Sequence, residues 1–296
     1  MRNRHLWWFA VLGFLPVLTV ASRAMHEGEV NHHGRAHPGE AFTPEKIAED
    51  VYAYLGKDGG SNSGFIVAPE GVIVIDAQNN ADLAANELAA IRDVTNAPIK
   101  FLIDTHHHGD HTGGNPMYEK EGVTIISHRE CRAAMIDREM KGLPILTFDG
   151  AIQLYVGGRD VHVFHFGWGH TKGDAVIVLP DENIVFAGDV LFSRKFPYVA
   201  DGNLDGWIES LARLKALNVK WVVPGHGPIS TNTEVEGLLG FFREVKSVVA
   251  GLKGEGKSLE DCKKSVDFTK YIDAGWGGGF FDSLPPMIVE WIYNSQ

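Results

Sequence analysis

The sequence predicts an α/β (α+β) fold in which mixed β-sheets are covered by helices. Short runs rich in β-branched and aromatic residues recur along the chain, and segments with helical spacing of apolar residues lie between them. A hydrophobic content of 44% with 22% charged residues suits one soluble domain with a large core. The early strands follow one another closely and the later ones alternate with helices, which favours mixed sheets packed against helices.

The individual elements follow from these patterns. The runs expected to form strands are residues 64–68, 72–76, 100–104, 123–127, 161–166, 175–179, 183–187 and 221–223. Helical spacing is clearest in residues 84–94, 207–217 and 235–252, where apolar residues recur every three or four positions. The last segment begins a C-terminal helical part of about residues 232–296, and we interpret its apolar stripe as core packing.

The N-terminus has the three-part pattern of a secretory signal peptide. Arg2 and Arg4 precede an apolar run at residues 6–20, and small residues follow at 21–24. We therefore expect a signal peptide at 1–24, a polar leader at 25–43, a folded domain at 44–296, and a periplasmic or secreted protein. An uncleaved membrane anchor is the alternative, but the apolar run is short for a span, so we expect no stable membrane insertion after cleavage.

The charge balance bears on possible partners. The formal net charge is -11, and cleavage after Ala24 would remove three arginines, giving -11 - 3 = -14. An acidic surface repels phosphate backbones, so we expect a small-molecule substrate and no nucleic acid. Two cysteines, Cys131 and Cys262, cannot form a disulfide framework. Whether they pair, and what oligomeric state the chain adopts, the sequence leaves open.

The most informative segment is residues 105–115, which follows an apolar run that we expect to be a buried strand. Four histidines and an aspartate fall between His106 and His111. Imidazole and carboxylate suit zinc and related divalent ions. His106 and His108, two apart in an extended loop, can share one ion, which displaces Asp110 and His111 toward a second ion. The segment therefore predicts a dinuclear metal site.

The pattern His106-x-His108-x-Asp110-His111 resembles the signature of the metallo-β-lactamase superfamily. Three further segments resemble that family's pattern and occur in its order, namely residues 166–174, 186–192 and 224–228. The resemblance covers roughly residues 50–230. It implies an αβ/βα four-layer sandwich of two mixed β-sheets flanked by helices.

The resemblance also implies a set of metal ligands. Metal 1 would be bound by His106, His108 and His170, metal 2 by Asp110, His111 and His226, and Asp189 would bridge the two. We expect two divalent ions, with Zn²⁺ favoured and manganese or iron as alternatives. A hydroxide bridging the ions would attack the carbonyl of an ester, lactone, thioester or lactam, and Asp110 would orient it as the catalytic residue.

The residue type at position 189 helps to distinguish the branches of the superfamily. Aspartate here resembles glyoxalase II, lactonases and many uncharacterised hydrolases, whereas zinc β-lactamases of two subgroups place Cys or a non-bridging Ser at this point. The segment at residues 188–207 resembles a subset of periplasmic hydrolases associated with sulfur oxidation and quinoprotein pathways. A true β-lactamase hydrolysing β-lactam antibiotics is the first alternative. An iron-dependent oxidoreductase resembling the persulfide dioxygenases is the alternative of another class, and a non-catalytic metal-binding role is a third.

Several residues near these ligands are candidates for a substrate pocket. Trp168, Lys172 and Tyr198 lie close to ligands in sequence, as do Phe192 and Phe196, and Lys172 is the candidate contact for a substrate carboxylate. The aromatic and glycine-rich stretch at 271–293 either packs on the sandwich or covers the site entrance.

Four further histidines are not expected to bind the metals. His107 is expected to point away from them, because its neighbours on both sides are ligands. His128 is expected to cap a helix, and His162 and His165 to have structural roles in a strand.

Overall fold

The computed structural model describes residues 43–57 and 60–295, so the predicted signal peptide and residues 25–42 of the predicted leader lie outside the described residues. The described part contains two mixed β-sheets, as predicted. None of the described helices is both long enough and apolar enough to cross a membrane.

The first sheet has seven strands in sequence order. Strands β1 to β4 pair antiparallel, and β4 to β7 pair parallel. The strands are β1 (Glu45–Ala48), β2 (Val51–Tyr54), β3 (Ser63–Ala68), β4 (Gly71–Ile75), β5 (Ile99–Ile103), β6 (Thr124–His128) and β7 (Leu146–Phe148).

The second sheet has five strands in the order β12-β11-β10-β9-β8. Its pairs are antiparallel except for β11 and β12, which run parallel. The strands are β8 (Ala151–Val156), β9 (Arg159–Phe164), β10 (Val176–Leu179), β11 (Ile184–Phe192) and β12 (Trp221–His226).

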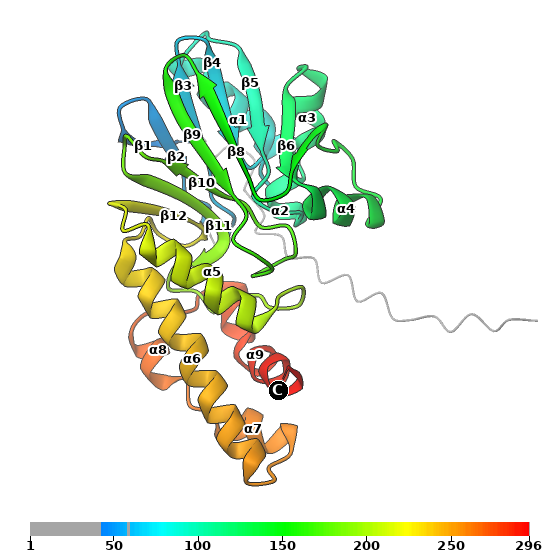
Figure 1. The fold of residues 1–296 in the computed structure, drawn as a ribbon, viewed down its shortest axis with the longest axis vertical. Helices are drawn as coiled ribbons and strands as arrows, with labels where there is room; N and C mark the ends of the chain where they lie inside the picture. Colours follow the sequence, from blue (N-terminus) through cyan, green and yellow to red (C-terminus); the bar gives the residue numbers. More distant parts are fainter. Residues whose placement is uncertain (1–42, 58–59, 296) are drawn as a thin grey trace, which may run out of the picture. The chain divides into compact units, whose positions relative to one another are not determined.

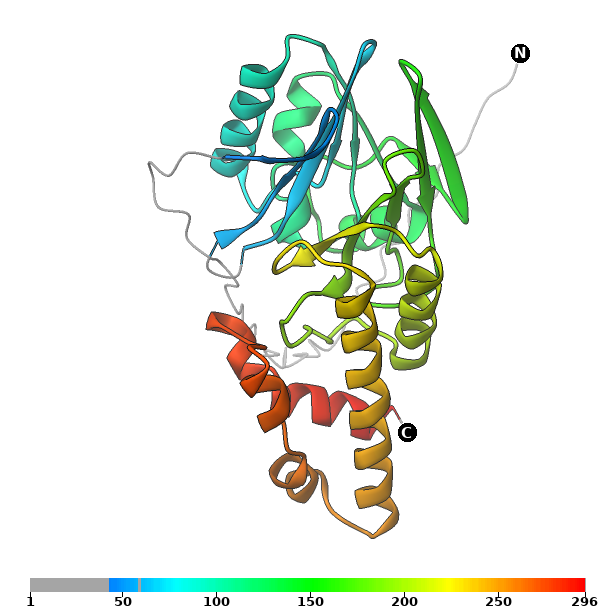
Figure 2. The same cartoon turned by 90° about the vertical axis from the view of Figure 1, so that its left-hand side faces the viewer.

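The sheets and helices form four layers (Figures 1 and 2). An apolar cluster with residues from both sheets, including Ile66, Ile73, Val163 and Ile177, fills the space between the sheets. Helices α1 (Ala81–Val94) and α3 (Asn115–Lys120) cover the outer face of the first sheet, and α5 (Leu204–Ala216) and α6 (Asn232–Gly254) pack together on the second. The predicted αβ/βα sandwich is confirmed.

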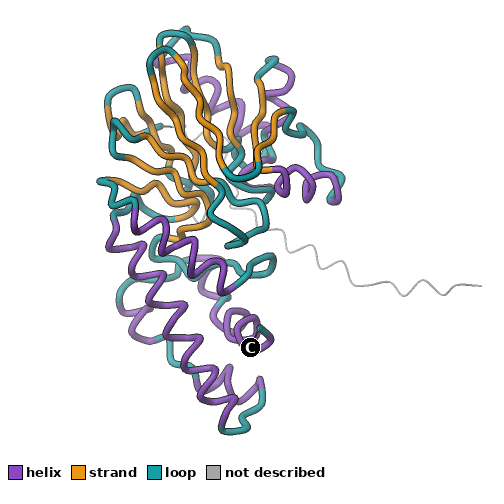
Figure 3. The backbone as a smooth tube through the Cα atoms, viewed as in Figure 1, coloured by secondary structure: helices purple, strands orange, loops and turns teal. Residues whose placement is uncertain are grey.

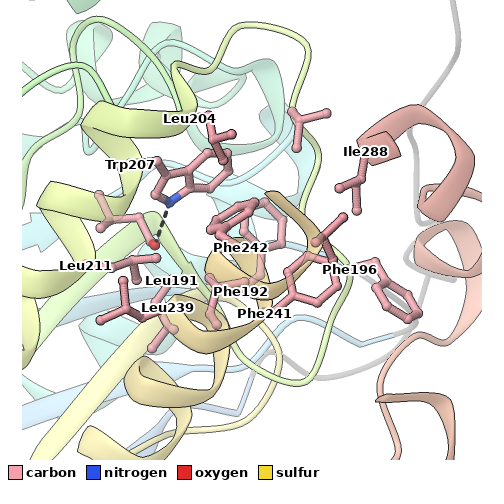
Figure 4. Packing of buried hydrophobic residues seen from close by; sticks show 14 of the residues in the cluster. Leu191, Phe192, Phe196, Leu204, Trp207, Leu211, Leu239, Phe241, Phe242 and Ile288 are labelled. Carbon is pink, nitrogen blue, oxygen red and sulfur yellow. Dashed lines mark hydrogen bonds between the residues drawn. The ribbon is translucent and has the colours of Figure 1, made fainter. Parts of the chain in front are cut away.

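The core outside the second sheet is rich in aromatic side chains (Figure 4). Trp207 of α5 is fully buried, its ring lies 5.0 Å from that of Phe242 of α6, and its Nε1 donates a hydrogen bond to the carbonyl oxygen of Val190, 2.9 Å away. This bond gives a buried indole N–H a partner and joins α5 to β11, which carries one of the predicted metal ligands. The helical spacing at 207–217 therefore does mark a core-facing helix.

The predicted strands lie within a few residues of the observed ones, but several elements were missed. β1, β2, β7 and β8 were not predicted as strands, and β11 continues to Phe192 instead of ending at residue 187. Residue 165 lies outside β9, so the prediction of a strand to residue 166 was too long. Short helices also went unpredicted, namely α2 (Gly109–Thr112) and α3, whereas the start of α4 (Arg129–Asp137) was expected at His128.

After β12 the described chain is helical (Figure 3). Thr231 caps α6, and its side chain and that of Glu234 form a capping box. The later elements are α7 (Leu259–Ser265), α8 (Thr269–Asp273), the 3₁₀ helix η2 (Gly279–Ser283) and α9 (Pro285–Asn294). Ile288 and Ile292 of α9 join the same apolar cluster as α5 and α6, so this part packs onto the sandwich.

Candidate metal centre

The predicted ligands meet at one end of the two sheets. β5 leads into the loop that carries His106 and His108, and the short helix α2 carries Asp110 and His111. The other three come from the second half of the chain: His170 from the segment between β9 and β10, Asp189 from β11, and His226 from the end of β12. The structure thus brings together all seven residues named from the sequence.

The first group consists of three histidines and Asp189, and its ring nitrogens converge. Nδ1 of His108 lies 3.1 Å from Nε2 of His106 and 2.9 Å from Nε2 of His170. Oδ2 of Asp189 lies 3.3 Å from Nε2 of His170. One donor atom from each residue falls within 4.8 Å of the others, which is close enough to hold a metal ion.

The second group consists of Asp110, His111 and His226, which also offer converging donor atoms. Oδ2 of Asp110 lies 3.2 Å from Nε2 of His226 and 3.5 Å from Nε2 of His111. Asp189 reaches this group as well, with Oδ1 lying 3.3 Å from Nε2 of His111. Asp189 therefore stands between the two groups.

Two observations indicate that these residues suit metal ions. Nε2 of His111 and Oδ1 of Asp189 are buried, and neither has a hydrogen-bond partner among the described residues, which is costly unless another species satisfies them. Burial also lowers the pKa of His106 well below its usual value and that of His170 to about 3. Those two imidazoles are therefore neutral, the form that binds a metal.

In the rest of the centre, neighbouring carboxylates and imidazoles shift one another's pKa values. Burial opposes ionisation of Asp189, but His226, His111 and the neighbouring imidazoles hold the pKa of that carboxyl well below its usual range. Burial likewise opposes protonation of His226, yet Asp189 and Asp110 raise its pKa to about 9. In the metal-free protein a proton on His226 thus occupies the place of a cation beside two carboxylates.

Each imidazole has a partner on the side away from the converging atoms. His106 donates from Nδ1 to Thr105 Oγ1, which itself donates to Asp76, and His111 donates from Nδ1 to Asp76 Oδ2. The remaining partners are Asp201 for His108, the carbonyl oxygen of Tyr198 for His170 and that of Gly60 for His226. Such partners fix the tautomer and orientation of a metal-binding histidine.

Two glycines let backbone segments approach beneath Asp189. The pairing of β11 with β12 is irregular around Gly188, whose φ of 49° is left-handed and whose Cβ, if present, would lie 2.6 Å from Thr105. A Cβ on Gly225 would lie 1.8 Å from Oδ1 of Asp189. Side chains at these positions would displace either the carboxylate or the loop after β5.

Three residues that support the site were not found from the sequence. Asp76 follows β4, the parallel neighbour of β5, and a carboxylate at that strand end was a usable signal. Arg138, just after α4, and Asp201, in the loop before α5, lie far apart in sequence and follow no motif. Asp201 lies 93 residues from His108.

The other histidines lie outside the two groups. His107 points toward Arg138, with Nε2 2.5 Å from Nη1 of that arginine. His128 caps α4, as predicted, by accepting a hydrogen bond from the backbone N–H of Glu130. His165 lies just beyond β9 and donates from Nδ1 to the carbonyl oxygen of Asp174, while His162 lies in β9 itself.

The predicted pocket residues separate into two sets. Trp168 and Tyr198 lie on the side of the first group: the Tyr198 ring is 5.8 Å from that of His108, and Trp168 Nε1 donates to the carbonyl oxygen of Asp201. Lys172 is exposed and its Nζ lies 4.7 Å from the Trp168 ring centre. Phe192 and Phe196 are each 1% exposed and belong to the apolar core, so including them in an open pocket was wrong.

A cavity of about 460 Å³ lies on the side of the second group. It is lined by Leu55, Gly56, Gly60, Lys195, Gly227, Pro228, Gly278 and Gly279. Gly60 and Gly227 are direct neighbours of His226, by hydrogen bond and by sequence respectively. Its size is typical of a small-molecule site.

The C-terminal stretch both packs on the sandwich and borders this cavity. Phe281 of η2 is buried with its ring 5.3 Å from that of His226, while Phe192 stacks on the same imidazole with a centroid distance of 5.2 Å. Gly278 and Gly279 reach the cavity wall. Of the two roles that the sequence left open, the structure shows the packing on the sandwich, and it adds a place in the wall of the cavity beside His226.

Comparison with known proteins identifies the family of this chain. The family model described as the metallo-beta-lactamase superfamily matches residues 56–226. The chain belongs to this superfamily. The relationship predicted from residues 106–111 is therefore confirmed, and with it the prediction of a metal-dependent hydrolase.

Relatives of this chain within the superfamily have different names and sources. A metallo-beta-lactamase type 2 of Bacteroides fragilis is 28% identical, over 62% of this chain and 78% of that protein. The lactamase-like protein notP of Aspergillus sp. (strain MF297-2) is 28% identical, over 83% of this chain and 78% of that protein. A hydroxyacylglutathione hydrolase of Pelagibacter ubique (strain HTCC1062) is 26% identical, over 59% and 65%.

Among solved structures, a metallo-beta-lactamase from Pontibacter korlensis superposes with a TM-score of 0.64 and 24% identity, covering 68% of this chain and 98% of that one. At this identity the likeness concerns the fold.

Proposed function

We propose that this chain is an exported hydrolase that holds two divalent ions, zinc foremost, and cleaves an ester, lactone, thioester or lactam in a small molecule. The observation that carries the proposal is the position of Asp189 between two groups of donor atoms. One of its oxygens lies 3.3 Å from Nε2 of His170 and the other 3.3 Å from Nε2 of His111. A carboxylate so placed can serve two ions at once.

The donor set fits zinc. Histidines 106, 108 and 170 would hold one ion and Asp110, His111 and His226 the other, with Asp189 shared. Two ions bound there would lower the pKa of a water molecule toward neutrality and polarise a carbonyl oxygen. The protein contributes fixed imidazole tautomers, set by the outer hydrogen bonds, and a largely buried centre.

Asp110 is the residue best placed to orient an attacking water. Its side chain is 27% exposed, whereas Asp189 is 4% exposed. Burial acts against its ionisation, but His111 and the hydrogen bond from His226 hold the pKa of Asp110 below its usual range. An ionised carboxylate accepts hydrogen bonds only, so it can hold a proton of the water and aim the oxygen lone pair at a carbonyl carbon.

Lys195 supports an anionic substrate. It is the one charged residue among those that line the cavity within the described part of the chain, and its Nζ donates to the carbonyl oxygen of Gly277, 2.6 Å away. An ammonium group at the wall of a small cavity favours a carboxylate on the bound molecule. We place the carboxylate contact at Lys195, with Lys172 as the competing assignment from the sequence.

Two matched variants separate these lysines. Lys195→Met should raise the KM for a carboxylated ester about tenfold, because one cationic contact is lost, and should leave the KM for its methyl ester unchanged. Lys172→Met should leave both values unchanged. Steady-state kinetics on the substrate pair measures this, and the reverse pattern would move the carboxylate contact to Lys172.

A β-lactam substrate is the second candidate, because relatives from Bacteroides fragilis and Elizabethkingia meningoseptica are named metallo-beta-lactamase type 2. The deciding measurement compares hydrolysis of a chromogenic cephalosporin with that of ester, lactone and thioester substrates, with zinc and with a chelator. Fast turnover of the cephalosporin would establish the lactamase activity. Turnover that survives complete chelation would refute the metal-dependent proposal for any substrate.

Metal analysis tests the redox alternative. Two zinc ions for each chain are expected in the purified protein. One iron for each chain, together with oxygen uptake in the presence of a persulfide, would favour an oxidoreductase.

Export is tested separately. Edman sequencing of the mature protein is expected to begin after Ala24, and an intact N-terminus at residue 1 in the exported fraction would favour an uncleaved anchor.

A further inference from the structure

We propose that Asp201, clamped by Arg138, positions His108 and thereby sets the affinity of the first metal group for its ion. The proposal rests on the metal centre proposed above and concerns one part of it. Neither residue belongs to the converging donor set of His106, His108, His170 and Asp189.

His108 uses its two ring nitrogens in opposite directions. Nδ1 faces the first group, 2.9 Å from Nε2 of His170, while Nε2 lies 2.8 Å from Oδ2 of Asp201. An ionised carboxylate oxygen only accepts, so the Nε2 atom carries a proton, and in the neutral imidazole this leaves Nδ1 unprotonated. Asp201 therefore selects the tautomer in which His108 can bind a metal through Nδ1.

Arg138 holds Asp201 in place. Nη2 of its guanidinium lies 3.0 Å from Oδ2 and 3.2 Å from Oδ1 of Asp201, and Nη1 donates to Nε2 of His107, 2.5 Å away. The indole of Trp168 fixes the same loop by donating to the carbonyl oxygen of Asp201, 2.8 Å away. The carboxylate is thus held by His108 and Arg138, and its backbone by Trp168, although the side chain is 32% exposed.

The cluster of His107, His108 and Asp201 could also be read as a third metal site, because donor atoms of the three lie within 4.8 Å of one another. Arg138 argues against that alternative. A guanidinium is always protonated and donates only, so at 2.5 Å it takes the lone pair of His107 Nε2. A second cation beside it would meet a fixed positive charge.

The proposal predicts a selective effect on one ion. Asp201→Asn keeps the shape of the side chain but replaces one acceptor oxygen with a donor and removes the charge that favours an N–H on His108. Loss of such an outer partner typically costs 10- to 100-fold in metal affinity. We expect one of the two zinc ions to bind about 10- to 100-fold more weakly in this variant, and the other to bind as in the wild type.

The experiment is a zinc titration of the metal-free full chain in competition with a chromophoric chelator. Asp205→Asn is the matched control, since it removes the same charge four residues away, at an exposed carboxylate paired with Lys246 on the outer helices. Arg138→Met should lower the affinity for the same ion by a smaller factor, because Asp201 keeps its hydrogen bond to His108. Asp201→Glu should restore part of the affinity.

A spectroscopic readout locates the change. Cobalt substituted for zinc shifts the N–H protons of metal-bound imidazoles far from the other resonances, and one such signal should exchange faster with solvent in Asp201→Asn than in Asp205→Asn. A purely structural role for Asp201 would instead change the unfolding temperature of the metal-free protein and leave this signal in place.

The outcomes distinguish this inference from the metal centre itself. A wild-type chain that binds no zinc refutes the proposed function. If the wild type binds two ions and Asp201→Asn binds them as tightly as Asp205→Asn does, the positioning role is wrong and the centre stands. A third zinc ion in the wild type that disappears in Asp201→Asn would overturn the role in favour of the metal-site alternative.

Discussion

Two carboxylates support the metal centre from outside, and they are built in opposite ways. Asp76 is 2% exposed and accepts hydrogen bonds from the backbone N–H of Thr105, from its hydroxyl and from His111. Asp201 stands in a surface loop, shares its oxygens with solvent and is held by the exposed Arg138. Asp76 is therefore part of the buried core at the end of the first sheet, whereas Asp201 contacts the centre from the protein surface.

Because the two carboxylates are placed differently, we expect Asp76 to affect the stability of the fold and Asp201 to affect the affinity for a metal ion. Asp76 supports His111 directly and His106 through Thr105, so it touches both groups and the strand ends that carry them. Its left-handed φ of 61° shows how closely the backbone after β4 is constrained. Asp201 touches only His108 within the donor set. Changes at Asp76 should therefore affect the stability of the fold, and changes at Asp201 mainly the affinity for an ion.

The largest expected effect tests the buried support. Asp76→Asn places an N–H donor among the three donors that Asp76 accepts from in a buried site, and breaking such an arrangement costs about 3–5 kcal/mol. Urea denaturation of the metal-free protein measures it. Asp201→Asn is the comparison and should cost less than about 1 kcal/mol, because its groups remain solvated. Equal losses in the two variants would remove the distinction between the supports.

The pH dependence of stability tests how strongly Glu87, a second buried carboxyl group on the side of the first sheet, is desolvated. Glu87 of α1 is fully buried, accepts from Ser63 and Tyr118, and burial raises its pKa from 4.5 to about 8. Between those two values the unfolded chain releases a proton that the folded protein retains, so the stability due to this group falls as the pH rises from about 4.5 to 8.

Glu87→Gln should remove this dependence. The difference in unfolding free energy between the variant and the wild type should grow by on the order of 3 kcal/mol from pH 5 to pH 8, in favour of the variant. Like the protonated acid, the neutral amide keeps an acceptor oxygen for the Ser63 hydroxyl. Chemical denaturation at several pH values measures the difference, and a constant difference would mean that Glu87 is solvated.

Each zinc ion should stabilise the fold by a smaller amount than these effects. Each ion adds about 2.7 kcal/mol when free zinc is 100-fold above its dissociation constant, because the unfolded chain lacks the assembled centre. Thermal unfolding with zinc and with a chelator measures the gain. In Asp201→Asn the gain should shrink at the same zinc concentration while the chelated protein unfolds as the wild type does, and a full gain in that variant would count against its selective effect.

The sequence was informative where the chemistry is local. Residues 106–111 place four of the donor side chains within one short loop, and a resemblance to a known family supplied His170, Asp189 and His226. The eight expected strands match because long β-branched runs mark buried strands. β1 and β8 were missed because exposed and buried residues mix along these edge strands, and polar residues interrupt the runs.

What the sequence could not predict depends on tertiary contacts. Arg138 and Asp201 meet only because α4 and the loop before α5 lie side by side at the site, and nothing near either residue indicates that contact. The same holds for Phe281, which reaches His226 from the other end of the chain. Trp168 was placed near the site correctly, but its role there is a hydrogen bond to a loop and was not foreseen.

The contact between Phe281 and His226 has a consequence for how the centre is completed. Every side chain of the first group, together with Arg138 and Asp201, precedes η2 in the sequence. The imidazole of His226 gains its last aromatic neighbour only when nearly the whole chain is present. The second group is therefore enclosed by the C-terminal part of the chain, whereas all the side chains of the first group come from the chain that precedes it.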